Sequence, residues 1–217
     1  MATTGGGGER EDDAAPARPR HPSGLPWPEE LAPPQPIVRL DGREVYRNAW
    51  ISVREDVVRF PHGHEGIYGV VTTNPCVGML PFVDDDHVVL VRQWRYVTGE
   101  PTWEMPTGGN RPGEEPEQAA QRELAEEIGR VAGRLDHLAT IDSSKSVVAE
   151  RATLFAAHDL QLATADELDA TEHLQVAVFP FERVVEMVRR SEILDAMTVV
   201  AVLHMALRVA TNRRGST

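Results

Sequence analysis

The stretch that most constrains the fold runs from residue 104 to residue 130, where a loop rich in glycine and proline leads into a helix. The loop spans Pro106 to Gly113, and the helix is predicted to begin near Pro116. Proline suits the first position of a helix, because it has no amide hydrogen to satisfy there and its φ is already helical. Gly129 is predicted to end the helix in the left-handed conformation. We therefore expect the chain to be organised around this loop and helix.

One side of the predicted helix gathers acidic side chains. Glu123 and Glu127 are one turn apart and face the same way, with Glu126 beside them. They border an apolar stripe that should face the core, formed by Ala120, Leu124 and Ile128. Like charges at this spacing repel each other, and more so when they are partly buried. A divalent cation would remove that repulsion, and carboxylate oxygens are the ligands that Mg²⁺ and Mn²⁺ prefer.

The alternative interpretation is a solvated acidic face, in which Arg122 and Arg130 pair with the glutamates at i,i+4 spacing. The spacing of the whole stretch decides against it. The pattern is Gly108, five residues, Glu114, seven residues, Arg122-Glu123-Leu124, one residue, Glu126-Glu127, one residue and Gly129. This pattern resembles the Nudix box. It departs from the family at Arg130, where an aliphatic residue is usual, and the departure affects local packing more than chemistry.

The bulk composition narrows the class of protein. A chain of 217 residues suits one domain with some extra chain at an end. Its net charge of −12 argues against non-specific binding to nucleic acid or to an anionic membrane. Cys76 is the only cysteine, so no internal disulfide is possible, and a small buried thiol is the expected role. With no membrane-spanning run and no signal pattern, we expect a cytoplasmic protein.

Four segments are predicted along the chain. Residues 1–36, rich in proline and glycine, are expected to be a disordered tail. Residues 37–73 alternate as short strands and should form a small antiparallel unit, with turns at Asp41-Gly42 and Pro61-His62-Gly63. Residues 74–212 should form the main domain, followed by a tail at 213–217.

The main domain mixes strands with a few helices. Apolar strands are predicted at 76–82 and 87–93, joined as a hairpin by the solvated turn Asp84-Asp85-Asp86. Further strands are expected at 134–141, 152–157 and 174–180, and amphipathic helices at 181–190 and 193–208. Met187, Met197 and Met205 should lie in the core. This order indicates an α/β or α+β fold, with a mixed sheet flanked by helices.

The resemblance extends beyond the box. From Glu44 to about Leu207 the chain resembles the ADP-ribose pyrophosphatase branch of the Nudix hydrolases. The segments that carry it are Val91-Arg-Gln-Trp-Arg95, Trp103-Glu-Met-Pro106 and Glu192-Ile-Leu-Asp-Ala-Met-Thr198. This likeness implies an α/β/α sandwich preceded by an N-terminal β unit. In relatives that unit is exchanged between two subunits, so a homodimer is expected here.

The resemblance also assigns roles to single residues. It implies that Glu123, Glu127 and Glu126 bind the metal, together with the backbone carbonyl of Thr107. Catalytic roles fall to Glu172, Glu126 and Arg122, the last of which would hold the glutamates. Structural positions in the motif are Gly108, Glu114 and Gly129. On the substrate side, Arg95 matches a phosphate contact and Glu104 a position near the metals. Trp94 is added for its own chemistry, because an aromatic ring beside arginines can stack on a base or sugar; edge packing and surface charge are the competing interpretation of this segment, and the one favoured when it is taken by itself.

The general base and the substrate are less closely defined. A base is expected in a loop after the box, with Glu172 as the first choice and Glu167 and Glu150 as alternatives; a solvated loop acid is the competing interpretation of Glu172. Relatives that prefer ADP-ribose usually carry a proline about fifteen residues beyond the box. This chain has Ser143-Ser144-Lys145-Ser146 there, and Lys145 could reach a phosphate or the distal group.

Three functions are open from the sequence. The first is Mg²⁺-dependent hydrolysis, with Mn²⁺ as a substitute, of a nucleoside diphosphate sugar such as ADP-ribose into a nucleoside monophosphate and a sugar phosphate. The second is hydrolysis of other diphosphates, including nucleoside triphosphates or dinucleoside polyphosphates. The third is a non-catalytic module that senses a nucleotide sugar. The intact glutamates favour an enzyme with a small nucleotide substrate over the third.

Overall fold

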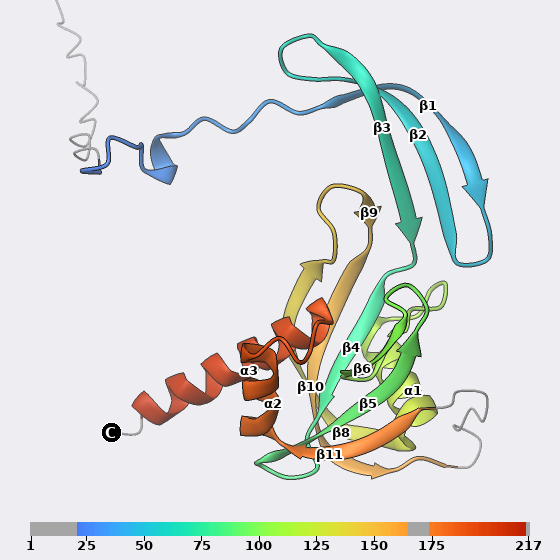
Figure 1. Ribbon diagram of the computed structural model, residues 1–217, viewed down its shortest axis with the longest axis vertical. Helices are drawn as coiled ribbons and strands as arrows, with labels where there is room; N and C mark the ends of the chain where they lie inside the picture. The colour runs from blue at the N-terminus through green and yellow to red at the C-terminus, as the bar shows by residue number, and fades with distance from the viewer. Residues whose placement is uncertain (1–20, 165–173, 216–217) are drawn as a thin grey trace, which may run out of the picture.

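The computed structural model describes residues 21–164 and 174–215 (Figure 1). Its strands are β1 (Val38–Arg47), β2 (Ile51–Arg59), β3 (Glu65–Thr73), β4 (Cys76–Pro81), β5 (His87–Arg95), β6 (Glu100–Glu104), β7 (Thr107–Gly109), β8 (Arg130–Asp142), β9 (Val148–Ala149), β10 (Arg151–Leu162) and β11 (Gln175–Pro180). Its helices are α1 (Pro116–Ile128), α2 (Phe181–Arg189), α3 (Ala196–Gly215) and the short 3-10 turn η1 (Pro28–Glu30). The mixed α/β class predicted from the sequence is confirmed. None of the helices in these ranges is long and apolar enough to cross a membrane.

The strands form three sheets. The N-terminal strands make one sheet in the order β1-β2-β3-β9, which projects from one end of the molecule in Figure 1. The other two have the orders β7-β4-β10-β8 and β11-β5-β6. Strand β10 runs parallel to β4 and antiparallel to β8, so the sheet that contains them is mixed.

The expected turn at Asp41-Gly42 is wrong, because β1 runs through it with a register shift between Arg39 and Asp41. Gly42 lies opposite Asp56, and a Cβ added there would be 2.3 Å from the Asp56 carboxylate oxygen Oδ1. In this strand the glycine therefore marks a close approach and not a reversal of the chain. The other predicted turn is confirmed, with Gly63 in the left-handed region at φ 83°.

The predicted hairpin forms only at its tip, where the Val83 amide donates to the His87 carbonyl at 3.0 Å. Strands β4 and β5 belong to different sheets, and a single bridge between Phe82 and Val88 joins their ends. Every residue of β4 is buried; β10 pairs along its whole length and β7 pairs with Cys76 to Gly78 on its other edge, whereas β5 pairs with β6 and β11. The segment between the strands is a solvated turn as expected, and the Asp84 carboxylate accepts from the amides of Asp86 and His87.

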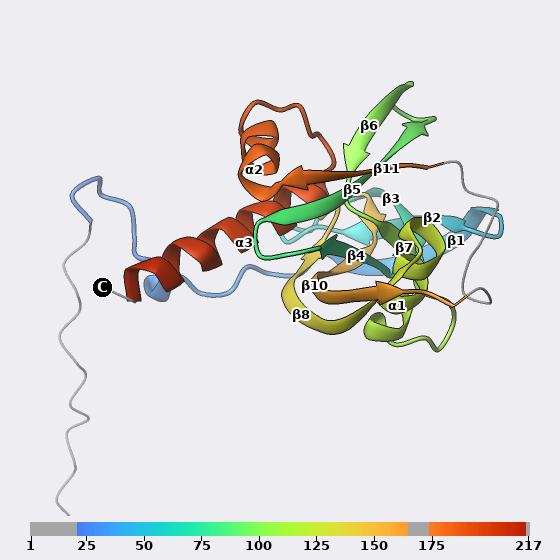
Figure 2. The same cartoon turned by 90° about the horizontal axis from the view of Figure 1, so that it is seen from below.

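Two groups of core residues fill the space on either side of the β4 sheet. Val77, Met79 and Phe155 pack with α1, whereas Leu80 and Leu154 pack with residues of α2 and α3. Successive side chains of β4 point to opposite faces of its sheet, so α1 lies on one face of the sheet and the C-terminal helices lie on the other, as Figure 2 shows. Among the predicted core methionines, Met187 is buried, and Met197 and Met205 are partly buried against the same group.

The last helix begins later than predicted, at Ala196 instead of residue 193. The Asp195 carboxylate accepts from the backbone amide of Thr198 at 2.7 Å, which is the bond that an N-cap side chain makes. Cys76 is a buried free thiol, as predicted, and burial raises its pKa to about 12.

Candidate active site

The position of α1 is set by its own first and last residues. Pro116 is its first residue, and the Gln118 side chain accepts from the backbone amide of Glu115 in a capping box. Gly129 ends the helix at φ 64°, in the left-handed conformation that was predicted. Ala119, Ala120 and Leu124 are fully buried, so this face of the helix lies against the β4 sheet.

Strand β7 lies across α1 at Glu123. A Cβ on Gly108 would be 1.9 Å from the Glu123 carboxylate carbon and 2.0 to 2.3 Å from its oxygens. Only glycine at this position leaves the carboxylate room, which is a physical reason for the first glycine of the motif. Thr107 adjoins it in β7, paired with Gly78 of β4.

Arg122 links three of the motif's carboxylates. Its Nη1 donates to Glu123 Oε1 at 2.6 Å and to Glu126 Oε2 at 2.9 Å, and its other nitrogens donate to both oxygens of Glu114 at 2.9 Å. A further bond reaches the carbonyl of Gly109 at 2.9 Å, which ties the loop to the helix. The Arg122 guanidinium lowers the pKa of the Glu114 carboxyl to about 2, so Glu114 stays ionised.

The donor set fits a divalent cation in its chemistry. The side chains of Glu123 and Glu126 are 12% and 21% exposed, and Glu127 is buried at 8%. Carboxylates that are partly shielded from water, next to backbone carbonyls, are suitable ligands for Mg²⁺ or Mn²⁺. Within the described ranges, no three acidic or other ligand side chains are already gathered as a cluster. The bonds of Arg122 to two of the glutamates explain how their like charges are balanced in this arrangement.

A second ion pair lies on the neighbouring sheet. Arg95 of β5 donates from Nε to Glu104 of β6 at 2.9 Å, and the two strands are antiparallel neighbours. Glu104 is buried at 2%. Burial raises the pKa of its carboxyl, Arg95 opposes that shift, and the nearby charge of Asp195 adds to the rise. The effect of Asp195 on Glu104 was not predicted from the sequence, although Asp195 lies in one of the three segments that carry the family resemblance.

The remaining predicted residues lie apart from these two clusters. Trp94 is next to Arg95 in β5, so its side chain projects from the face of the strand opposite to that of Arg95. It is 65% exposed. Lys145 is exposed in the loop after β8. Glu150 accepts hydrogen bonds from Ser143 Oγ at 2.6 Å and Thr73 Oγ1 at 3.2 Å. Glu167 and Glu172 lie outside the described residues.

Comparison with known proteins agrees with this geometry. A family model of the NUDIX domain matches residues 72–197, and a model of the nucleoside diphosphate sugar hydrolase N-terminal domain matches residues 38–71. The ADP-ribose pyrophosphatase of Bacillus subtilis (strain 168) is 29% identical over 168 residues, which cover 77% of this chain and 91% of that protein. The methanol dehydrogenase activator of Bacillus methanolicus is 24% identical over 172 residues, covering 79% and 93%.

A solved structure of an ADP compounds hydrolase matches with a TM-score of 0.75 and 25% identity, over 84% of this chain and 98% of that one. The NUDIX model alone covers more than half of the 217 residues. The resemblance predicted from residues 104 to 130 is confirmed, and the chain belongs to the NUDIX domain family and is a hydrolase.

Proposed function

We propose that the protein hydrolyses the diphosphate linkage of a nucleoside diphosphate sugar, with ADP-ribose as the first candidate. The products would be a nucleoside monophosphate and a sugar phosphate. The observation that carries the proposal is the packing of Gly108 on Glu123, with Arg122 joining the loop to the carboxylates of α1. The matched N-terminal model and the activity named for the Bacillus subtilis relative support the substrate class.

In this proposal Glu123, Glu126 and Glu127 hold Mg²⁺, or Mn²⁺ in its place, with the Thr107 carbonyl as a further ligand. The metal would neutralise the diphosphate and lower the pKa of a bound water. Arg122 orients two of these glutamates through the bonds described above.

Arg95 is proposed to contact a substrate phosphate, since a guanidinium matches phosphate geometry and this side chain is 40% exposed. Glu104 positions that guanidinium. Trp94 is proposed to stack on a base or sugar. The base that accepts the proton of water is proposed to be Glu172, and Glu150, held by Ser143 and Thr73, is the alternative within the described residues.

A second candidate is hydrolysis of other ADP compounds. The solved structure that matches over 98% of its length is named an ADP compounds hydrolase, and residues 143–146 lack the proline that accompanies ADP-ribose preference in relatives. A panel of substrates separates the two candidates, because they differ only in the group attached to the diphosphate.

The experiment is a panel of nucleoside diphosphate sugars, dinucleotides and triphosphates, each with Mg²⁺, with Mn²⁺ and with chelator, and with products identified by chromatography. Hydrolysis of a diphosphate sugar is expected, with loss of activity in chelator. Glu127→Gln should lower kcat by at least about 100-fold, because a neutral amide is a poor ligand for a hard cation. Glu117→Gln, on the exposed first turn of the same helix, is the matched control. Equal activity of Glu127→Gln and the parent would sink the proposal.

The organisation of the chain is part of the proposal. We infer that residues 37–73 form a dimerisation unit, that residues 74–212 form the hydrolase domain, and that residues 1–36 and 213–217 are tails. A homodimer is supported by the apolar side chains that the N-terminal sheet exposes, among them Tyr46 and Ile67. The partners are a small nucleotide and a second copy of the chain, with no nucleic acid or membrane. A cytoplasmic location is consistent with the single free thiol.

A further inference from the structure

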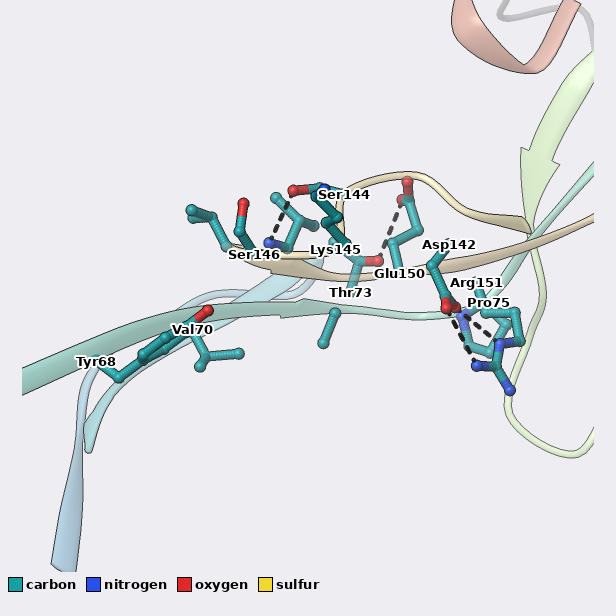
Figure 3. Close-up of a pocket in the computed structure, with 13 residues that line it drawn as sticks. Tyr68, Val70, Thr73, Pro75, Asp142, Ser144, Lys145, Ser146, Glu150 and Arg151 are labelled. Carbon is teal, nitrogen blue, oxygen red and sulfur yellow. Dashed lines mark hydrogen bonds and ion pairs between the residues drawn. The ribbon is translucent and has the colours of Figure 1, made fainter. Parts of the chain in front are cut away.

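A cavity of about 500 Å³ lies between strand β3 and the loop that joins β8 to β10 (Figure 3). Tyr68 and Val70 line it from the strand, and residues 144–151 line it from the loop. Its volume suits a sugar with its substituents. The side chains come from segments more than seventy residues apart in sequence, which the pairing of Val71 with Val148 brings together.

The cavity adjoins the loop that leads into α1. Pro75 lines the cavity, and its carbonyl accepts from the amide of Asn110 at 2.8 Å. The next residue, Cys76, pairs with Gly109 of β7. One wall of the cavity is therefore joined directly to the strand that covers Glu123. A molecule whose diphosphate lies at α1 has this cavity as a neighbouring place for its distal group.

The acceptors in the cavity are already engaged. The Asp142 carboxylate accepts from Arg151 Nε at 2.9 Å, and both oxygens of Glu150 accept from the hydroxyls of Thr73 and Ser143. The groups without such a bond can all donate. Among the interactions of the described residues, none engages the Lys145 ammonium or the hydroxyls of Tyr68 and Ser146. The groups left to meet a ligand therefore carry one positive charge and three sets of donor hydrogens.

The identity of the cation is informative. Lys145 is the only lysine among the 22 lysine and arginine residues of the chain, so arginine serves at every other cationic position. Arginine offers a planar fork, whereas lysine offers a compact ammonium on a flexible stem with three donors. A compact ammonium in a cavity that two hydroxyls also line is suited to a group with several oxygens and a negative charge.

We propose that this cavity binds an anionic group, a phosphate or a carboxylate, on the distal sugar of the substrate, and that Lys145 selects for it. This inference rests on the proposed function and narrows its substrate class to nucleoside diphosphate sugars with a charged distal part. Tyr68 and Ser146 supply the further hydrogen bonds.

The first test compares matched substrates that differ only in the charge of the distal sugar. The pairs are ADP-ribose with ADP-ribose 1″-phosphate, and UDP-glucose with UDP-glucuronic acid. The charged member is expected to have a kcat/KM about tenfold higher or more, since a hydrogen bond to a charged group contributes that much discrimination. Lys145→Gln should bring the ratio of kcat/KM between the charged and the uncharged member close to one. Lys145→Arg should keep part of the preference for the charged member. Arg189→Gln, which removes an exposed charge from α2, is the matched control and should leave the ratio unchanged.

The second test measures binding without turnover. An amine-reactive ester can modify only Lys145 and the chain's amino terminus, so peptide mass spectrometry reports the two rates separately in one sample. In chelator, the charged compound at ten times its Kd should slow modification of Lys145 by about tenfold, because only the free protein reacts. The amino terminus serves as the internal reference.

The outcomes separate this inference from the proposed function. Hydrolysis of diphosphate sugars with no preference for the charged member, and no protection of Lys145 by either charged compound, overturns the cavity assignment alone. Equal protection by inorganic phosphate at the same concentration also overturns it, because that result describes a site for free anions. Selective protection by the charged sugars supports the assignment even if the panel finds no turnover.

Discussion

At the scale of the residue, Gly108 carries the contact on which the site depends. The Glu123 carboxylate occupies the space where a side chain at residue 108 would begin, with 1.9 Å between the added Cβ and the carboxylate carbon. Gly108→Ala is therefore expected to displace Glu123 and lower kcat/KM by about 100-fold, as a shift of one ångström at a catalytic group does. Steady-state kinetics with the best substrate of the panel measures the effect.

Gly109→Ala is the control for that experiment. A Cβ at residue 109 meets nothing within 4 Å, and the residue lies in the same strand. Its activity should stay within about twofold of the parent, because surface changes of this kind have small effects. Similar losses in both variants would show that β7 tolerates no alanine at all, and the specific role of Glu123 would then be wrong. Thermal melts of both proteins exclude unfolding as the cause.

Features of single residues could be predicted from the sequence where their cause lies within a few neighbouring residues. The ends of α1 follow from Pro116 and Gly129, whose backbone preferences act within one turn, and both were predicted. The motif marked Gly108 as a structural position, but its close approach to Glu123 was not predicted, because it depends on how β7 packs against α1. The burial of Glu104 was not predicted, because it depends on residues far along the chain, among them Thr198 of α3, which bonds to the next residue, Met105.

At the scale of the element, the first turn of α3 holds the chain between β6 and β7. The buried Thr198 hydroxyl donates to Asp195 at 2.6 Å and accepts from the amide of Met105 at 3.0 Å. Thr198→Val removes both bonds while keeping the shape of the side chain. It should reduce the free energy of unfolding by about 1 to 3 kcal/mol, since a buried amide is left without a partner. The melting temperature should fall by about 2 to 4 °C for each kcal/mol.

Two further variants make that prediction specific. Thr198→Ser keeps the hydroxyl and should recover most of the lost stability. Thr211→Val removes a hydroxyl from the exposed far end of the same helix, where it donates to the Leu207 carbonyl, and should change stability little. Calorimetry or circular dichroism gives the melting temperatures. Equal melting temperatures for Thr198→Val and the parent would show that the bonds of Thr198 to Asp195 and Met105 do not stabilise the fold.

The errors of prediction at this scale were errors of pairing. The strands at β4 and β5 were found from their apolar residues, but their assignment to two sheets depends on other strands, since β4 pairs with β7 and β10 and β5 pairs with β6 and β11. Likewise, Asp41-Gly42 has the composition of a turn, and only the side chain of Asp56 on the neighbouring strand explains the glycine. Local composition identifies strands, whereas their partners are decided by residues far along the chain.

At the scale of the whole molecule, the N-terminal sheet projects from one end (Figure 1), and several of its apolar side chains are exposed. Val57 of β2 pairs with Ile67 of β3, and they are 39% and 69% exposed; Val38 and Tyr46 of β1 lie on the same face. The role of this surface could be expected only from the family resemblance, because its residues alternate like those of any half-buried sheet. The same face carries the ion pairs Arg43–Glu55 and Arg59–Glu65. Exposed apolar side chains bordered by charged ones are typical of an interface between subunits.

We therefore predict that the protein is a dimer in solution, with a mass about twice the 24.0 kDa of one chain. Ile67→Asp, which replaces the most exposed of these four apolar side chains with a charge, should weaken dimerisation at least about tenfold, or about 1.4 kcal/mol. Leu207→Asp, at an apolar side chain of α3 that is 67% exposed, is the matched control and should remain dimeric. Sedimentation velocity over a range of concentrations measures the association, and circular dichroism confirms that each variant is folded. A folded Ile67→Asp variant that dimerises as tightly as the parent would move the interface away from this face, and a monomeric parent would remove the exchange of N-terminal strands altogether.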